Sequence, residues 1–121
     1  MRILLAEPHV KVLRALQALI NEKTEHRIVG EASNLEVLLL QVENTKPDVV
    51  MLDWDLPSLN SQKLKKATSA RADFPRLIVM SSQNDIEEEA LDSGADAFID
   101  KCLPPSKLLE ALTRIQDELD K

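Results

Sequence analysis

The chain has 121 residues, 44% of them apolar, which is enough for one domain with a single hydrophobic core. Fifteen basic residues against 21 acidic ones give a net charge of −6, which disfavours direct binding to nucleic acid phosphates. A lone cysteine, Cys102, excludes an intramolecular disulfide, and no apolar run approaches the roughly 20 residues of a membrane span. We therefore expect a cytoplasmic protein that contacts neither nucleic acid nor membrane.

The first half of the chain predicts three strands and two helices. Residues 3–6 form an apolar run, and the helix after it ends before His26. That helix has one apolar face made by Val12, Leu13, Leu16, Leu19 and Ile20. Residues 27–32 mix apolar and charged side chains, which suits an edge strand. A helix over residues 35–42 follows, and Pro47 introduces the third strand, residues 49–52.

The second half continues the alternation. A lysine-rich helix is expected over residues 60–70, and a strand over 77–80. Asn84 and Asp85 are candidate caps of a fourth helix, which Gly94 would end. A strand over 95–99 precedes a last helix, which begins at the two prolines 104 and 105. The apolar stripe of that helix consists of Leu108, Leu112, Ile115 and Leu119. Five strand–helix repeats of this kind predict a parallel sheet with crossover helices.

Polar residues follow four of the apolar strands. They are Glu7, Asp53, Ser81 and, one residue further beyond its strand, Lys101. Because parallel sheets place their chemistry beyond the carboxyl ends of the strands, we expect these side chains to converge. Two carboxylates need a cation beside them, and a carboxylate, a hydroxyl and an ammonium together can hold a phosphoryl group. The set therefore indicates phosphoryl chemistry with Asp53 as the nucleophile.

These residues resemble the receiver domains of two-component response regulators, and the resemblance covers essentially the whole chain. The segments RIVGEASN and KPDVVMLDWDLP are similar to receivers attached to LuxR-type transcriptional regulators. The resemblance implies one receiver domain over residues 1–121 with a flavodoxin-like (βα)5 fold. Its doubly wound five-stranded parallel sheet would have the strand order 2-1-3-4-5.

The resemblance also implies a role for each site residue. Asp53, followed four residues later by Pro57, would accept a phosphoryl group from a histidine kinase, and Ser81 and Lys101 would sense it. Phe98 would be the aromatic switch residue, and the signal would leave through the surface of the fourth helix, fifth strand and fifth helix. The implied cofactor is Mg²⁺, held by Glu7, by Asp53 and by the backbone carbonyl of Asp55. An effector domain, a downstream protein and a homodimer are all compatible with this reading.

Two positions depart from the family pattern. Pro8 stands where the family has a second acidic residue that ligates the metal, so we expect weakened Mg²⁺ binding. Cys102 stands where the family has a proline after a cis peptide bond. Because a cis bond before another residue is costly, we expect a trans Lys101–Cys102 bond, with Lys101 displaced.

Two alternatives to phosphorylation-dependent signalling stay open. One is a pseudo-receiver, an interaction module of the same fold that Pro8 has deprived of its metal site. The other is a small phosphatase of the haloacid dehalogenase type, because Asp53-Trp54-Asp55 after a strand resembles the DxD motif of those enzymes. Those enzymes carry the motif on the first strand and not the third, so we expect that this protein is not an enzyme.

Overall fold

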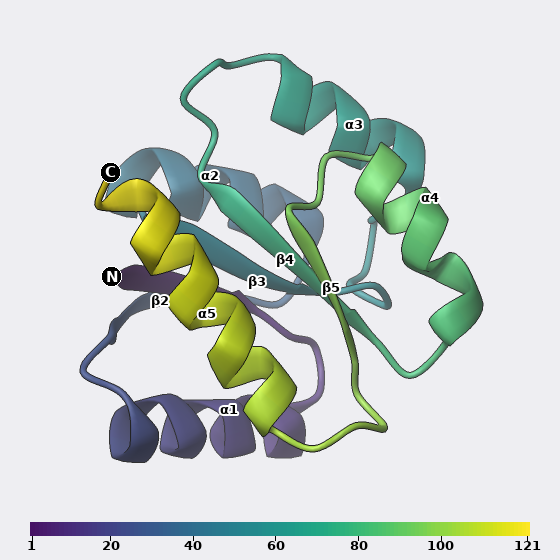
Figure 1. Cartoon of the computed structure of the whole chain (residues 1–121). Helices are drawn as coiled ribbons and strands as arrows, with labels where there is room; N and C mark the ends of the chain where they lie inside the picture. Colours follow the sequence, from purple (N-terminus) through teal and green to yellow (C-terminus); the bar gives the residue numbers. More distant parts are fainter.

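A computed structural model describes residues 1–121, the whole chain, and contains one sheet of five parallel strands (Figure 1). The strands are β1 Arg2–Ala6, β2 Arg27–Ala32, β3 Val49–Asp53, β4 Arg76–Ser81 and β5 Ala97–Asp100. Their order across the sheet is β2-β1-β3-β4-β5, so the predicted order is confirmed. β2 lies at an edge, as its mixture of charged and apolar residues predicted.

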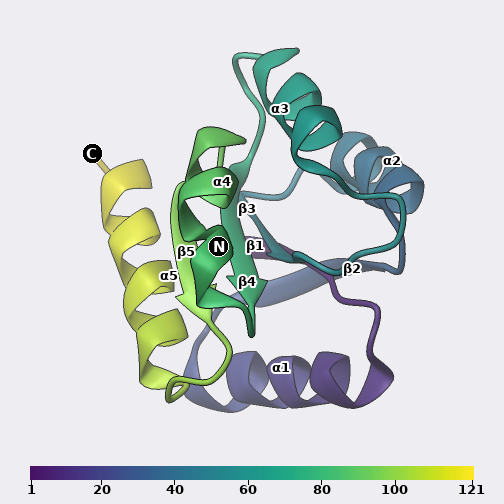
Figure 2. The same ribbon diagram turned by 90° about the vertical axis from the view of Figure 1, so that its right-hand side faces the viewer.

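Five helices connect and follow the strands. They are α1 Val10–Lys23, α2 Leu35–Thr45, α3 Ser61–Ser69, α4 Glu87–Asp92 and α5 Ser106–Leu119. α1 and α5 cover one face of the sheet, and α2, α3 and α4 cover the other (Figure 2). The side chains of Asn34 and Asn60 accept hydrogen bonds from the first turns of α2 and α3 and so fix where these helices begin. No helix here combines the length and the apolar character that a membrane span requires.

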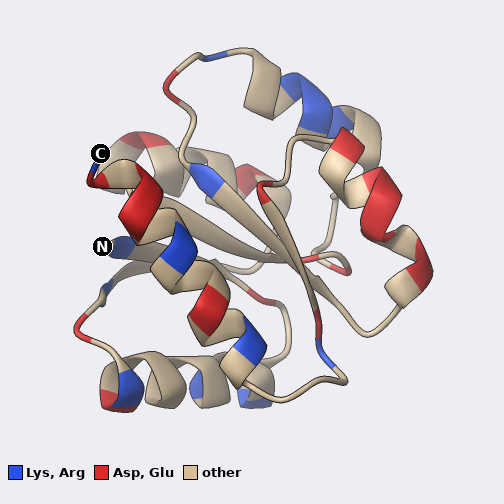
Figure 3. Cartoon of the chain, in the orientation of Figure 1, with Lys and Arg blue, Asp and Glu red and all other residues tan.

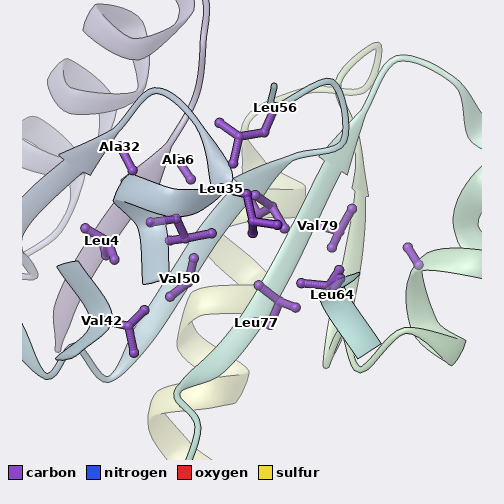
Figure 4. Close-up of a cluster of buried hydrophobic side chains, with 13 residues drawn as sticks. Leu4, Ala6, Ala32, Leu35, Val42, Val50, Leu56, Leu64, Leu77 and Val79 are labelled. Atoms are coloured by element: carbon purple, nitrogen blue, oxygen red, sulfur yellow. The ribbon is translucent and has the colours of Figure 1, made fainter. Parts of the chain in front are cut away.

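The core is divided by the sheet into two clusters, because successive residues of a strand point to opposite faces. Leu4, Val50 and Val79 face α2, α3 and α4 (Figure 4). Ile3, Met51 and Ile78 face α1 and α5. β3 is buried over its whole length, because helices cover both of its faces. This burial fixes the position of Asp53, the last residue of β3.

The structure corrects three details of the predicted helices and strands. Asn84 and Asp85 do not cap α4 with their side chains; they lie in a short 3-10 turn, residues Asn84–Ile86, that precedes it. β5 begins at Ala97 and not at residue 95, because the chain is still leaving the turn at Gly94, whose φ is 112°. Leu119, predicted to complete the apolar stripe of α5, is 44% exposed because α5 extends past the edge of the core.

Candidate functional site

The four polar residues that follow the strands meet at the carboxyl edge of the sheet. Asp53 ends β3 and Ser81 ends β4, while Glu7 and Lys101 each come directly after a strand, β1 and β5. The strand register brings these ends level, with Ala6 opposite Leu52 and Asp53 opposite Met80. Glu7 and Asp53 are each only 2% exposed. The predicted convergence therefore holds for the acids and Lys101, and Ser81 is buried beside them.

Lys101 is the cation of this pocket. Its Nζ donates to Glu7 Oε1 at 2.6 Å and also contacts Asp53 Oδ2. Burial of the ammonium acts to lower its pKa, but its hydrogen bonds to Asp53 and Glu7, with their negative charges, outweigh burial, so the pKa of Lys101 is raised. The Lys101–Cys102 bond is trans, as predicted, since the chain contains no cis peptide bond. The displacement of Lys101 relative to other receivers stays a prediction; with the trans bond, its side chain contacts both acids.

Backbone N–H groups hold the second oxygen of each acid. The N–H of Asp55 donates to Asp53 Oδ1 at 2.7 Å, and the N–H of His9 donates to Glu7 Oε2 at 3.1 Å. Each carboxylate is therefore fixed by one local backbone donor and by Lys101. The only signal in the sequence for the donor at His9 is the acid two residues before it.

Ser81 is buried, whereas the neighbouring Ser82 is exposed. The Ser81 hydroxyl accepts a hydrogen bond from the N–H of Gln83 at 3.0 Å and does not bond to Asp53 or Lys101. Its backbone carbonyl accepts from the N–H of Lys101 at 2.9 Å, which joins the ends of β4 and β5. Ser81 thus lies in the pocket with a hydroxyl proton that has no acceptor in the chain.

The side chains of the remaining candidate residues lie around the pocket and not in it. Phe98 is half-buried and packs against the cluster beneath α2, α3 and α4. Trp54 also packs on that cluster. The Asp55 side chain and Pro57 are exposed, and the Pro57 carbonyl accepts the N–H of Leu35 at the start of α2.

The donor atoms available to a cation come from Glu7, Asp53 and the backbone. No group of three or more histidine, cysteine or acidic side chains is placed to hold a metal ion. Mg²⁺, however, is held in many proteins by one or two carboxylates, with water and phosphate oxygens completing its six ligands. The two buried carboxylates meet that requirement, and Pro8 supplies no third.

Comparison with known proteins agrees with this geometry. Residues 3–113 match the family model described as the response regulator receiver domain. The chain is 32% identical over 112 residues to the nitrate/nitrite response regulator protein NarL of Escherichia coli K12, covering 91% of this chain and 52% of that protein. It is 28% identical over 116 residues to the chemotaxis protein CheY of Thermotoga maritima, covering 94% and 96% of the two chains. The chain therefore belongs to the receiver domain family of two-component response regulators.

Solved structures support the same fold. The isolated receiver domain of RcsB from Salmonella enterica, solved in the presence of the phosphomimetic BeF₃⁻, superposes with a TM-score of 0.87 at 20% identity. That match covers 97% of this chain and 88% of the other. The chain spans about half the length of NarL and of similar curated regulators.

Proposed function

We propose that Asp53 is the phosphoacceptor of this receiver and that a partner histidine kinase supplies the phosphoryl group. The observation that carries the proposal is the buried contact of Lys101 with both Asp53 and Glu7 at the carboxyl edge of the sheet. A carboxylate held by a cation and a backbone N–H is oriented for attack, which a nucleophile requires. The family assignment supports the same chemistry.

In the proposed transfer, a carboxylate oxygen of Asp53 attacks the phosphorus of a phosphohistidine. The new O–P bond forms as the P–N bond breaks, and the electron pair returns to the imidazole nitrogen, which takes up a proton. Lys101 and the Ser81 hydroxyl proton bind the oxygens of the transferred group. Glu7, Asp53 and the backbone carbonyl of Asp55 would hold Mg²⁺, which when bound neutralises negative charge on the phosphoryl group.

Signal output follows because phosphorylation changes the hydrogen-bond partners of Lys101 and Ser81. Lys101 bonds to Glu7 and Asp53 before the reaction and to phosphoryl oxygens after it, and Ser81 gains an acceptor for its hydroxyl. Because the two states differ in these contacts, phosphorylation can shift the equilibrium between them. Phe98, on the strand that leads to Lys101, is the proposed switch residue, and the α4-β5-α5 surface is the proposed output.

The test is intact-mass measurement after incubation with acetyl phosphate, with and without Mg²⁺. We expect the wild type to gain the mass of one phosphoryl group in the presence of Mg²⁺ and the Asp53→Asn variant to gain none. Asp55→Asn, which changes a nearby exposed acid, is the matched control and should still be labelled. If the folded wild type is not labelled while a standard receiver is, the phosphorylation-independent module replaces this proposal.

A further inference from the structure

α3 and α4 are neighbours on one face of the sheet and carry opposite charge (Figure 3). Residues 61–70, which contain α3, include three lysines and no acid: Lys63, Lys65 and Lys66. Residues 84–92, which contain α4, include five acids and no base: Asp85, Glu87, Glu88, Glu89 and Asp92. All eight of these residues are exposed. The surface formed by the two helices therefore has a basic half on α3 and an acidic half on α4.

The two halves are held in a fixed arrangement. Leu64 of α3 and Ala90 of α4 are buried in the same core cluster. The Thr68 hydroxyl donates to the carbonyl of Ser93 at 3.0 Å, which joins α3 to the end of α4. Because the core and this hydrogen bond anchor both helices, the basic and acidic halves form one preformed surface.

Charged residues occupy the outermost positions of both helices. Lys66 follows the buried Leu64 by two residues and so lies on the opposite side of α3. Glu88 and Asp92 stand two residues before and two residues after the buried Ala90, so they lie on the opposite side of α4. A partner that approaches this surface would therefore meet these charges first.

The opposite charges border one hollow without pairing. The hollow has a volume of about 460 Å³ and is lined only by polar residues: Ser61, Gln62, Lys65, Asp85, Glu88, Glu89, Asp92 and Ser93. No lysine of α3 and no acid of residues 84–92 forms an ion pair in the chain. Lys63 alone is held, by the Ser58 carbonyl at 3.3 Å. Both sets of charges thus remain available to a partner.

We propose that this α3–α4 surface binds a second copy of the chain. A two-fold axis that lies between the helices in the plane of contact would place α3 of each copy over α4 of the other. Lysines would then face acids twice in one dimer. A uniformly basic partner would be repelled by α3 and a uniformly acidic one by α4, whereas the same surface turned by 180° complements both halves.

The proposed contact is distinct from the α4-β5-α5 surface. Glu87 and Leu91 of α4 line the hollow beside α5, whereas Glu88 and Asp92 line the hollow beside α3. The contact also goes beyond the proposed function, because it does not depend on whether Asp53 accepts a phosphoryl group. Since no apolar side chain lines the α3–α4 hollow, we expect a dimer that is weak and sensitive to salt.

The experiment is sedimentation equilibrium of the whole chain at protein concentrations up to about 1 mM, which covers the weak affinities of small polar contacts. We expect the wild type to dimerise. Raising the ionic strength from about 0.1 M to about 1 M should weaken the dimer about tenfold, because salt screens exposed charges. The variants Lys65→Glu, Lys66→Glu and Glu88→Lys, Asp92→Lys should each dimerise at least about tenfold more weakly, since like charges would then face each other.

An equimolar mixture of these two double variants tests the geometry of the contact. In a mixed dimer the acidic α3 of one variant faces the basic α4 of the other, and the basic α3 faces the acidic α4. We therefore expect the mixture to dimerise at least as tightly as the wild type, although each variant alone does not. Both variants keep a net negative charge, so overall attraction between them cannot produce this result.

The matched control reverses two exposed acids elsewhere, Glu22→Lys and Glu25→Lys, and should dimerise like the wild type. A wild type that stays monomeric over the whole concentration range would overturn the proposal. So would a dimer that the α3 and α4 variants leave unchanged, because another surface would then make the contact. Equal weakening by the control would mean that overall charge governs association and would overturn it too. Because no phosphodonor is present, failure of the proposed phosphorylation does not affect the outcome.

Discussion

Lys101 Nζ lies 2.6 Å from Glu7 Oε1, so two residues 94 positions apart in the sequence form a buried ion pair at the carboxyl edge of the sheet. The same ammonium contacts Asp53, and the Lys101 side chain is only 21% exposed. One cation thus serves two acids that would otherwise repel each other away from water. The stability of the pocket depends on this arrangement.

Replacing Lys101 with methionine should destabilise the fold, because it leaves two buried carboxylates without their cation. Removing one partner of a buried pair costs about 3–5 kcal/mol, and we expect the free energy of unfolding in urea to fall by that order. Added Mg²⁺ should restore part of the loss, since the ion can replace the ammonium between the acids.

The control for this prediction is Lys107→Met. Lys107 is exposed and pairs with Glu110 at 3.8 Å, so its removal should change the unfolding free energy by less than about 1 kcal/mol. The double variant Asp53→Asn, Lys101→Met should be more stable than Lys101→Met alone, because it buries one charge fewer. If the double variant is no more stable, Lys101 contributes mainly through packing of its stem.

Replacing Pro8 with aspartate should strengthen Mg²⁺ binding by about tenfold or more, because affinity for hard cations rises with the number of carboxylate ligands. Pro8 follows Glu7 directly and is partly buried, so a carboxylate there is next to the existing acids. Fluorescence of Trp54, the only tryptophan and the residue after Asp53, reports the binding.

Pro8→Ala separates the gain of a carboxylate from the loss of the proline ring. It should leave Mg²⁺ affinity close to that of the wild type. Equal tightening in Pro8→Asp and Pro8→Ala would mean that the ring, and not the missing acid, limits metal binding.

The two acids around Lys101 also predict a dependence of stability on pH. Because the pKa of Lys101 is raised in the folded state, the folded chain holds this proton more tightly than the unfolded chain. The resulting stabilisation is complete below the ordinary lysine pKa, about 10.4, and is lost as pH rises through the folded pKa. The free energy of unfolding in urea should therefore fall more steeply above about pH 10 for the wild type than for Lys101→Met. If the unfolding free energies of the two proteins fell in parallel with pH, Lys101 would not be the source of this pH dependence.

Much of the fold could be predicted because each strand carries a clear signal. The run Val49–Leu52 is apolar without alternation, as a strand covered on both faces must be, and Asp53 marks its end. The mixed β2 was placed at the edge for the opposite reason. The predicted start of α4 is wrong, because Asn84 and Asp85 favour capping locally while the chain there makes a 3-10 turn.

The candidate site could be predicted as a set of residues but not as a set of contacts. Strand order and parallel direction alone bring Glu7, Asp53 and Lys101 to one edge, whatever their side chains do. Which acid the Lys101 ammonium contacts depends on how far the lysine side chain extends across the strand ends. Sequence spacing therefore could not show that Lys101 would reach Glu7 as well as Asp53.

Gly94→Ala should destabilise the chain by about 1–3 kcal/mol, because Gly94 has a φ of 112°, a conformation that costs other residues this order of energy. An added Cβ would also meet the Thr68 side chain. Thr68 cannot easily move aside, since its hydroxyl donates to the carbonyl of Ser93 at 3.0 Å and so joins α3 to the end of α4. Urea unfolding measures the loss.

Thr68→Ala distinguishes the two causes. If backbone strain dominates, Gly94→Ala should cost nearly the same whether or not Thr68 is present, because removing the contact leaves φ unchanged. If the contact dominates, the double variant should be little worse than Thr68→Ala alone. Gly30→Ala serves as a second comparison: its φ is not positive, and the new Cβ would meet the ends of the Leu4 and Gln41 side chains. We expect Gly94→Ala to cost more than Gly30→Ala, since the backbone strain at Gly94 cannot be relieved by a side-chain rotation.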